Sequence, residues 1–205
     1  MPRSRLTTFE QVLLGLIFMA PSTGYELKRR FATTPMGVYQ PSSGALYPAL
    51  GRLERRGLLR LEELRPPENR GRPRRLYQPT EEGRQAHLAW VREPVGPRTV
   101  SQDLGLHLVR FVMMERVLPQ DEVIAFLASL RDALAGFVAT LEPAASTAGA
   151  GAGAAGTGGN PYAELAVEHG LAVHRASLAW AEQAIARLAA DAPPADAPPT
   201  GHRDG

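Results

Sequence analysis

The sequence predicts a mainly helical protein in which a small β-hairpin interrupts a series of helices. Apolar residues recur every three or four positions along most of the chain, which is the spacing of amphipathic helices. Between residues 58 and 78 this spacing gives way to two short strand-like runs separated by prolines, glycines and arginines. These observations predict an N-terminal unit of helices and a hairpin, followed by a purely helical unit.

The first two predicted helices each begin with residues that can form a capping box. Thr8 and Gln11 have the required spacing, and Pro21 stops the helix that they open. Thr23 and Glu26 have the same spacing and open a short second helix.

The third predicted helix begins at Ser42 or Ser43, either of which can accept a hydrogen bond from the first free amides. Leu46, Leu50 and Leu53 then fall on one side of this helix. The opposite side carries small or cationic residues, so the helix is expected to bury one face and expose the other.

A hairpin is predicted directly after the third helix. Gly57 can end that helix in a left-handed conformation, and residues 58–64 and 74–78 can pair as strands. Thr80 can cap a fourth helix. Three helices followed by a hairpin with a basic tip make a winged helix-turn-helix, and we assign it to residues 1–92.

Residues 101–190 are predicted to form an α-helical dimerisation and effector domain. Ser101 can cap a helix that runs to about Arg116, and two later helices carry apolar seams with alternating spacings of three and four. The seam of the last helix contains Leu171, Leu178, Ile185 and Leu188. Such seams suit either a helical hairpin within one chain or a coiled coil between subunits. The seven-residue spacing of the first three favours one continuous helix–helix seam.

Two further segments have biased compositions. Residues 143–160 are almost wholly Ala, Gly, Ser and Thr, which predicts a flexible linker, and residues 191–205 are rich in Pro and Ala, which predicts a disordered tail. Gly151–Gly156 matches the dinucleotide-binding pattern GxGxxG, but no strand precedes it. We therefore interpret this stretch as part of the linker.

Charge is distributed unevenly between the two predicted domains. Residues 1–92 hold 16 of the 23 Lys and Arg and 8 of the 21 Asp and Glu, which gives +8. Residues 93–205 hold the remaining 7 and 13, which gives −6. The basic half is therefore expected to face a polyanion.

The sequence offers no catalytic or cofactor site. The absence of cysteine excludes disulfides, thiol catalysis and Cys-based zinc sites. His169 and His174 are five residues apart, which misses the spacing of helical metal pairs. We therefore expect no enzymatic activity, no cofactor and no metal. No secretory signal or membrane-spanning run is predicted, so a cytoplasmic protein is expected.

The basic face of the predicted winged helix is a candidate DNA-binding surface. The start of the third helix would enter the major groove, where small residues allow close approach and free amides attract phosphate. Arginines at the tip of the hairpin would reach the minor groove or the adjacent backbone. The candidate DNA-binding residues are Lys28, Ser42, Ser43, Gly44, Tyr47, Arg52, Arg70, Arg72 and Arg74. For Tyr47, partial burial against the second helix is an equal alternative.

The motifs within residues 9–90 resemble those of the PadR family of transcriptional regulators. The shared segments are Gly24-Tyr-Glu-Leu, Ser43-Gly-Ala-Leu-Tyr-Pro-Ala-Leu-Gly-Arg-Leu-Glu54, Gly71-Arg-Pro-Arg-Arg-Leu-Tyr77 and Thr80-Glu-Glu-Gly83. The resemblance implies a homodimer that binds a pseudo-palindromic operator in double-stranded DNA, usually as a repressor.

The resemblance also implies release from DNA by a small aromatic or drug-like effector near the dimer helices. Trp90 and Trp180 are the candidate effector-binding residues, although hydrophobic packing at a helix interface explains them as well. The alternative function is a protein-interaction module in which the winged helix is structural and the acidic helices recruit a partner.

Overall fold

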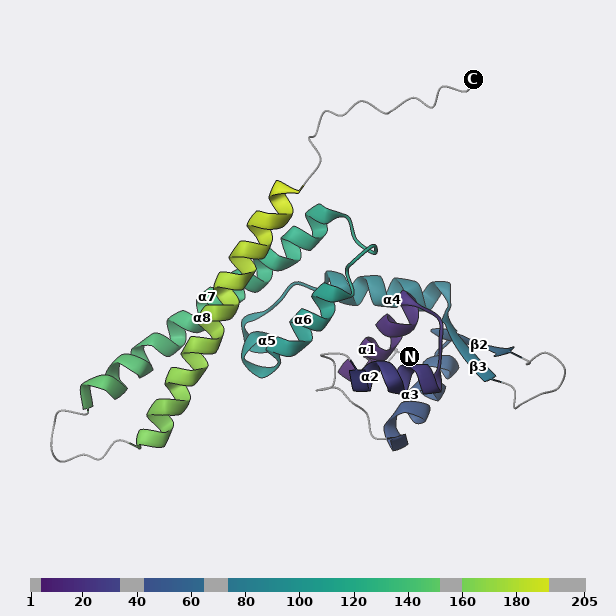
Figure 1. Ribbon diagram of the computed structural model, residues 1–205, viewed down its shortest axis with the longest axis horizontal. Helices are drawn as coiled ribbons and strands as arrows, with labels where there is room; N and C mark the ends of the chain where they lie inside the picture. Colours follow the sequence, from purple (N-terminus) through teal and green to yellow (C-terminus); the bar gives the residue numbers. More distant parts are fainter. Residues whose placement is uncertain (1–4, 34–42, 65–73, 152–159, 192–205) are drawn as a thin grey trace, which may run out of the picture. The chain divides into compact units, whose positions relative to one another are not determined.

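The computed structural model of the chain describes residues 5–33, 43–64, 74–151 and 160–191, which form two compact units (Figure 1). The first unit comprises Met1–Glu93 and Gly105–Val117, and the second comprises Pro94–Leu104 and Leu118–Gly205. The described residues are mostly helical, with a three-stranded antiparallel sheet in the first unit. This confirms the predicted fold class.

The first unit contains the predicted helices α1 (Thr8–Met19), α2 (Gly24–Thr33), α3 (Ser43–Arg55) and α4 (Glu81–Arg92). Their buried apolar side chains form one core, to which α1 contributes most. The core residues of α1, α2 and α3 include Val12, Leu13, Leu14, Ile17, Leu27, Phe31, Leu46, Ala49, Leu50 and Leu53.

The caps of α1 and α2 are both reciprocal capping boxes. At α1 the box is formed by Thr7 and Glu10, so the predicted pair of Thr8 and Gln11 was wrong by one residue. The box of Thr23 and Glu26 at α2 is confirmed, because the Thr23 amide donates to the Glu26 carboxylate at 2.7 Å. Thr7 and Thr8 are adjacent, so the local sequence allows a capping box in either of two registers. The contact of Glu10 with Arg52, which is 42 positions away, cannot be predicted from the local sequence.

The sheet consists of β1 (Ser22–Thr23), β2 (Leu59–Leu64) and β3 (Arg74–Pro79), in the order β1-β3-β2. The predicted hairpin is confirmed, since β2 and β3 pair antiparallel with Leu61 opposite Tyr77. Strand β1 was not predicted, because two residues carry no detectable periodicity.

Two glycines fix the connection from α3 to α4. Gly57 has a φ of 72°, which glycine adopts without steric cost, and its amide donates to the Glu54 carbonyl at 2.8 Å. Thr80 caps α4 by accepting from the Gly83 amide at 3.0 Å, as predicted. A Cβ atom on Gly83 would lie 2.0 Å from the Leu58 carbonyl oxygen, so the first turn of α4 approaches β2 too closely for any side chain.

The segment predicted as one helix from Ser101 to about Arg116 is instead divided. Helix α5 (Pro97–Gln102) ends at Asp103, whose backbone is not helical (φ −155°, ψ 71°), and α6 (Leu104–Val112) begins directly afterwards. Most of α6 belongs to the first unit, whereas the sequence had placed it in the C-terminal domain.

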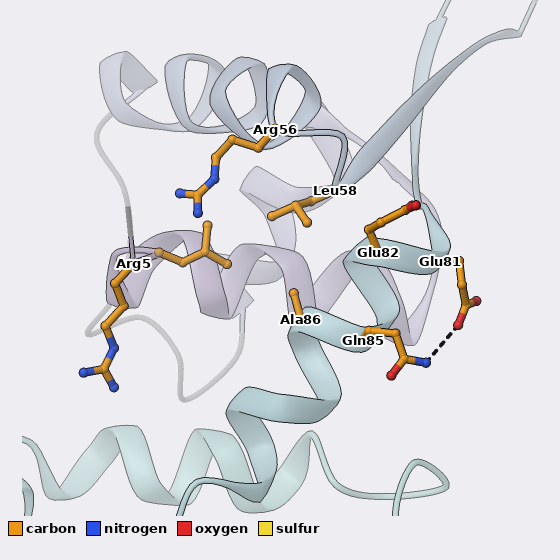
Figure 2. Close-up of a pocket in the computed structure, with 8 residues that line it drawn as sticks. Arg5, Arg56, Leu58, Glu81, Glu82, Gln85 and Ala86 are labelled. Atoms are coloured by element: carbon orange, nitrogen blue, oxygen red, sulfur yellow. Dashed lines mark hydrogen bonds between the residues drawn. The ribbon is translucent and has the colours of Figure 1, made fainter. Parts of the chain in front are cut away.

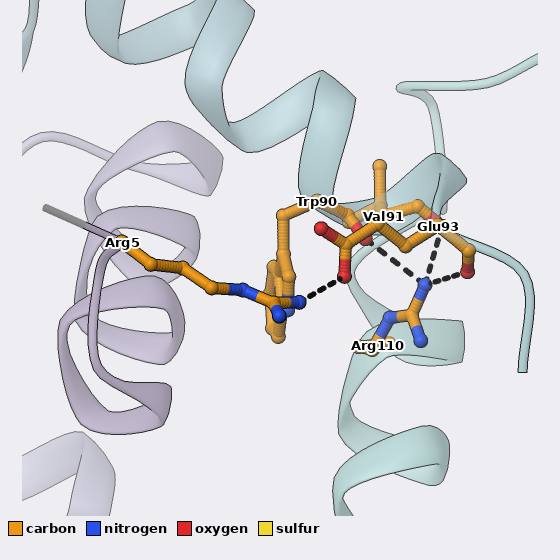
Figure 3. Close-up of polar contacts among 5 residues, drawn as sticks. All are labelled: Arg5, Trp90, Val91, Glu93 and Arg110. Carbon is orange, nitrogen blue, oxygen red and sulfur yellow. Dashed lines mark hydrogen bonds and ion pairs between the residues drawn. The ribbon is translucent and has the colours of Figure 1, made fainter. Parts of the chain in front are cut away.

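Arg110 of α6 binds the end of α4 within the first unit (Figure 3). Its guanidinium donates to the carbonyl of Trp90 at 2.9 Å, to that of Val91 at 3.2 Å and to that of Glu93. A cation at the C-terminus of a helix is favoured by the helix dipole and by the unpaired carbonyls there. The Glu93 carboxylate accepts in turn from Arg5 at 3.0 Å. Arg110 is 4% exposed, and burial lowers its pKa to about 10.

In the second unit, α7 (Gln120–Gly151) and α8 (Pro161–Ala190) lie side by side and antiparallel (Figure 1). Arg175 pairs with Glu142 at 2.6 Å, and the Gln120 side chain donates to the Leu188 carbonyl. The buried face of α7 includes Phe126, Leu127, Leu130, Ala133, Leu134 and Val138. Helix α5 also packs against α7.

The predicted linker over residues 143–160 differs from the structure in its first part, because α7 continues through Pro143 to Gly151. The remainder of the linker, residues 152–159, and the predicted tail from residue 192 lie outside the described residues.

One helix in the described part of the chain, over residues 120–143, is long and apolar enough to cross a membrane by length and composition. The buried apolar side chains of this helix are those through which α7 packs against α8 and α5. A core helix of a globular domain meets the same criteria of length and composition.

Candidate nucleic-acid interface

Helix α3 buries one face and exposes the other, as a helix that enters the major groove must. Leu46, Leu50 and Leu53 are at most 2% exposed, which anchors the helix in the core of the first unit. Gly44 and Tyr47 are exposed, and the Tyr47 side chain is 59% exposed. Because the ring also lies against Gly24 at the start of α2, neither the DNA contact nor the partial burial against the second helix is overturned.

Exposed cations occur on α2, which packs against α3, and on β3. Lys28 on α2 and Arg74 at the start of β3 are both exposed. Among the other predicted DNA-binding residues, Ser43 is the first residue of α3, whereas Ser42, Arg70 and Arg72 lie outside the described residues.

Arg52 has a contact that the sequence did not predict. Its Nε atom lies 2.6 Å from Oε1 of Glu10 on α1, although the two residues are 42 positions apart. The other oxygen of that carboxylate accepts from the Thr7 amide at 2.9 Å. Burial alone would raise the pKa of Glu10, but the hydrogen bonds from Arg52 and Thr7 outweigh it and lower that pKa. Arg52 therefore fixes α3 on α1, while the side chain as a whole stays 46% exposed.

A hollow of about 570 Å³ opens between the start of α2, the exposed face of α3 and the start of β3. Tyr25, which is 73% exposed, and Tyr47 line it together with Arg29, Arg74 and Arg75. The candidate DNA-binding residues named above include Tyr47 and Arg74 of these five, and the sequence also places Arg29 beside Lys28 on the second helix as a possible backbone contact. The signal for Tyr25 was present in the sequence, since residues two positions apart on a helix do not share a face and Leu27 belongs to the buried one.

Gly24 allows the Tyr47 ring to lie against the first turn of α2. A Cβ atom at Gly24 would stand 2.7 Å from Cε1 of Tyr47 and 3.1 Å from its hydroxyl oxygen. The position of the Tyr47 ring in the hollow therefore depends on the absence of a side chain at residue 24.

Tyr77 forms the buried side of the hollow. It is 6% exposed and follows Arg75 by two positions on β3, so both side chains are on one face of the strand. Burial raises the pKa of the Tyr77 hydroxyl, against the opposing effect of Arg75, which hydrogen-bonds it. The phenol consequently stays protonated at neutral pH.

A second hollow, of about 590 Å³, lies elsewhere in the first unit (Figure 2). Leu58 and Ala86 contribute apolar surface, Arg5 and Arg56 border it on one side, and the start of α4 borders it on the other. Gln85 donates to Glu81 at 2.9 Å across the first turn of α4. Neither predicted effector-binding tryptophan lines this hollow.

The two tryptophans belong to different compact units. Trp90 is 5% exposed and packs between His87, at 6.0 Å between ring centroids, and the Arg110 guanidinium, at 5.8 Å from the ring centroid. Trp180 is half-buried on α8. Trp90 thus has the packing role that was the alternative to effector binding.

The predicted dimerisation residues all lie on α8. Leu171 is 8% exposed, while Leu178, Ile185 and Leu188 are half-buried. Part of this seam is therefore covered by packing within the chain. Helix α8 additionally exposes Tyr162, Leu165 and Val173, which sequence analysis did not single out.

Comparisons with known proteins agree with this description of the first unit. Residues 13–88 match the sequence model of the transcriptional regulator PadR-like family. No curated protein matches the chain in sequence.

Several solved structures are similar to the chain at low sequence identity. Bacillus subtilis PadR in complex with operator DNA is 16% identical, with 89% of this chain and 99% of that chain covered and a TM-score of 0.41. A PadR-like transcriptional regulator from Bacillus cereus is 19% identical, with coverages of 90% and 99% and a TM-score of 0.36. Bacillus subtilis PadR in complex with p-coumaric acid is 16% identical, with coverages of 89% and 96% and a TM-score of 0.38.

The family match spans α1 from its second turn, α2, α3, the hairpin and most of α4, which are the elements that form the exposed basic face. Residues 13–88 of the chain are therefore similar in sequence to the transcriptional regulator PadR-like family.

Proposed function

We propose that the protein is a homodimeric transcriptional repressor that binds a pseudo-palindromic operator through the exposed face of α3 and the wing. The observation that carries this proposal is the division of α3 into a buried leucine face and an exposed face with Gly44 and Tyr47, together with the exposed cations Lys28 on α2 and Arg74 on β3. The +8 charge of residues 1–92 supports a polyanionic partner. The protein bound at a promoter would repress transcription by blocking access to that promoter. This binding would take place in the cytoplasm.

The proposed contacts divide into two groups. Ser42, Ser43, Gly44 and Tyr47 would face base edges and phosphates at the groove, and Lys28, Arg70, Arg72 and Arg74 would contact the backbone. Arg52 completes the proposed set. It would act mainly by holding α3 in place, because its Nε is bound to Glu10.

Binding should be tested with duplexes from the upstream region of the protein's own gene, by fluorescence anisotropy at several salt concentrations. Affinity is expected to fall steeply with salt, because cations replace the counterions of the phosphates. The triple variant Tyr47→Ala, Arg72→Ala and Arg74→Ala is expected to lose roughly two orders of magnitude in affinity. An unchanged affinity would overturn the assigned surface. Failure of the wild type to bind at low salt would favour the alternative protein-interaction module.

The proposed dimer uses α8. Tyr162, Leu165 and Val173 are 82%, 62% and 39% exposed, and such apolar side chains on one helix are typical of an interface between subunits. The predicted dimerisation residues Leu171, Leu178, Ile185 and Leu188 follow another line along α8 and would contribute where packing within the chain leaves them accessible. Sedimentation equilibrium at micromolar concentration should give a dimer mass for the full chain and a lower mass for Leu165→Glu. Ala166→Glu, next to it on the exposed surface, is the matched control. A monomeric wild type would refute the dimer.

The proposal also includes a small aromatic or drug-like effector that weakens DNA binding, with Trp90 and Trp180 as its candidate contacts. Trp180 is the better placed of the two, because it is half-buried whereas Trp90 is 5% exposed in packed surroundings. Titration of the Trp90→Phe variant with aromatic acids, followed by fluorescence of Trp180, would detect such a site. Quenching that accompanies release of DNA is expected, and release without quenching would place the site elsewhere.

A further inference from the structure

We propose that the hollow between α2, α3 and β3 is a seat for one phosphodiester group of the DNA backbone, with Tyr25 and Arg75 as its principal contacts. The inference rests on the proposed function and assigns a role to residues outside the predicted set. Four observations support it: the charge of the lining residues, the hydroxyl donors, the exposure of the site and the order of its walls.

The hollow is cationic. Arg29, Arg74 and Arg75 line it, together with the single carboxylate Glu26. That carboxylate already accepts from the amide and the hydroxyl of Thr23, at 2.7 and 3.0 Å, and these hydrogen bonds lower its pKa. Glu26 therefore stays ionised, and one of its oxygens accepts hydrogen bonds within the helix cap. Three arginines and one carboxylate give the lining of the hollow a net charge of +2, which favours a bound anion.

The hollow also presents phenol hydroxyls, which donate to phosphate oxygens without adding charge. Tyr25 and Tyr47 both line it and are 73% and 59% exposed. Guanidinium groups supply paired donors for the same oxygens, which gives strong, charge-assisted hydrogen bonds. A phosphodiester, with one charge and several acceptor oxygens, matches this combination of donors.

The walls of the hollow are ordered by contacts within the fold. Arg75 hydrogen-bonds the buried Tyr77, and the Tyr47 ring rests where Gly24 has no side chain. These contacts restrict the motion of the Arg75 guanidinium and the Tyr47 ring before DNA binds, which lowers the entropic cost of binding. The hollow borders the exposed face of α3, so a helix docked in the major groove would place the backbone of one strand beside it.

Substitutions that remove one donor at a time test the assignment. Tyr25→Phe deletes a single hydroxyl that is exposed, and Arg75→Gln deletes one charge. We expect each to weaken DNA binding by about tenfold. Arg75→Gln should also reduce the slope of log K against log salt by about 0.9, whereas Tyr25→Phe should leave the slope unchanged. Arg98→Gln is the matched control for Arg75→Gln, since its side chain is exposed in the second unit, and the wild type is the reference for Tyr25→Phe.

The ligand itself is tested by replacing single phosphates of the duplex with neutral methylphosphonates. At one position in each half-site, the methylphosphonate is expected to lower the DNA affinity of the wild type about tenfold. The same substitution should leave the affinity of the Tyr25→Phe, Arg75→Gln double variant almost unchanged, because that variant already lacks the contact. Competition with inorganic phosphate at millimolar concentration distinguishes a free anion from the backbone. Displacement of DNA by phosphate alone, with no sensitive methylphosphonate position, would overturn the assignment to DNA.

Failure of this inference can be separated from failure of the proposed function. If the wild type binds DNA and both variants bind as tightly as their controls, the hollow is not a phosphate seat and the proposed function stands. If the wild type binds no duplex at all, both proposals fail. Thermal unfolding of Tyr25→Phe should match that of the wild type, which shows that any lost affinity does not come from misfolding.

Discussion

The Nε atom of Arg52 on α3 lies 2.6 Å from the Oε1 atom of Glu10 on α1, and the same carboxylate caps its own helix. This ion pair joins the candidate recognition helix to the first helix of the fold. The Glu10 side chain is 4% exposed, so its charge has little water to compensate for a lost partner.

Glu10→Gln is expected to lower the free energy of unfolding by about 2 kcal/mol, since a charged hydrogen bond to a half-exposed arginine is lost together with part of the cap. Because the folded-state pKa of Glu10 is lowered from 4.5, the stabilisation is present above that value and is lost as pH falls through the folded pKa. Urea unfolding at pH 7 and pH 3 measures both effects. Glu63→Gln on the exposed side of β2 is the control, and equal losses in the two variants would contradict the prediction.

Two glycine-to-alanine substitutions should separate binding from stability. Gly24→Ala places a methyl group against the exposed Tyr47 ring, which can rotate away, so DNA affinity should fall about tenfold with little change in stability. Gly83→Ala places one against the Leu58 carbonyl, which cannot move freely, so stability should fall by about 3 kcal/mol. Thermal unfolding and anisotropy of both variants measure the two effects. Unfolding of Gly24→Ala at a much lower temperature would contradict this division.

His87 should make the first unit sensitive to mild acid. The residue is 1% exposed beside the Phe18 ring, and burial lowers its pKa from 6.5 to about 4, against the opposing effect of the Met113 backbone. Its unfolded state therefore binds a proton first as pH falls, and stability is lost from about pH 6.5 down to about pH 4.

His87→Leu should consequently remove about 2 kcal/mol of the stability difference between pH 7 and pH 4.5, measured by urea unfolding. His169→Gln, at an exposed position of α8, should leave that difference unchanged. An identical pH dependence in wild type and His87→Leu would show that other groups cause the acid sensitivity.

Arg110→Met should destabilise the end of α4 by about 3 kcal/mol, because three backbone carbonyls lose a charged donor. Arg110→Lys is expected to recover only part of this loss, since an ammonium group lacks the planar fork. Hydrogen exchange of the amides in α4 and α6, together with thermal unfolding, reports the effect. Arg116→Met, whose side chain is 91% exposed, is the control, and equal melting of the two variants would refute the capping role.

Much of the first unit could be predicted because its signals are local. The Thr23–Glu26 box, the Gly57 turn, the Thr80 cap and the paired strands each depend on residues within a few positions of one another. The leucine face of α3 follows from helical periodicity, and with it the exposed position of Tyr47.

The features that the sequence did not predict depend on distant contacts. The partner of Arg52 is 42 positions away, and the carbonyls of Trp90 and Glu93 that Arg110 binds are 20 and 17 positions away from it. Strand β1 exists only through its pairing with β3, with Ser22 opposite Tyr77. Helix α7 continues past the expected start of the linker, with Pro143 inside the helix. The Ala, Gly, Ser and Thr composition of this segment had predicted a flexible linker instead.

The return of residues 105–117 to the first unit means that neither unit is a contiguous piece of the chain. A gene fusion or an evolutionary crossover placed after Glu93 would transfer a winged helix without the arginine that closes α4 and without the methionine that meets Gly15. A functional chimera would have to join at about residue 117 and so would carry residues 94–104 along with it. The first unit therefore includes a segment that follows residues 94–104, and a single cut after Glu93 would not transfer the first unit whole.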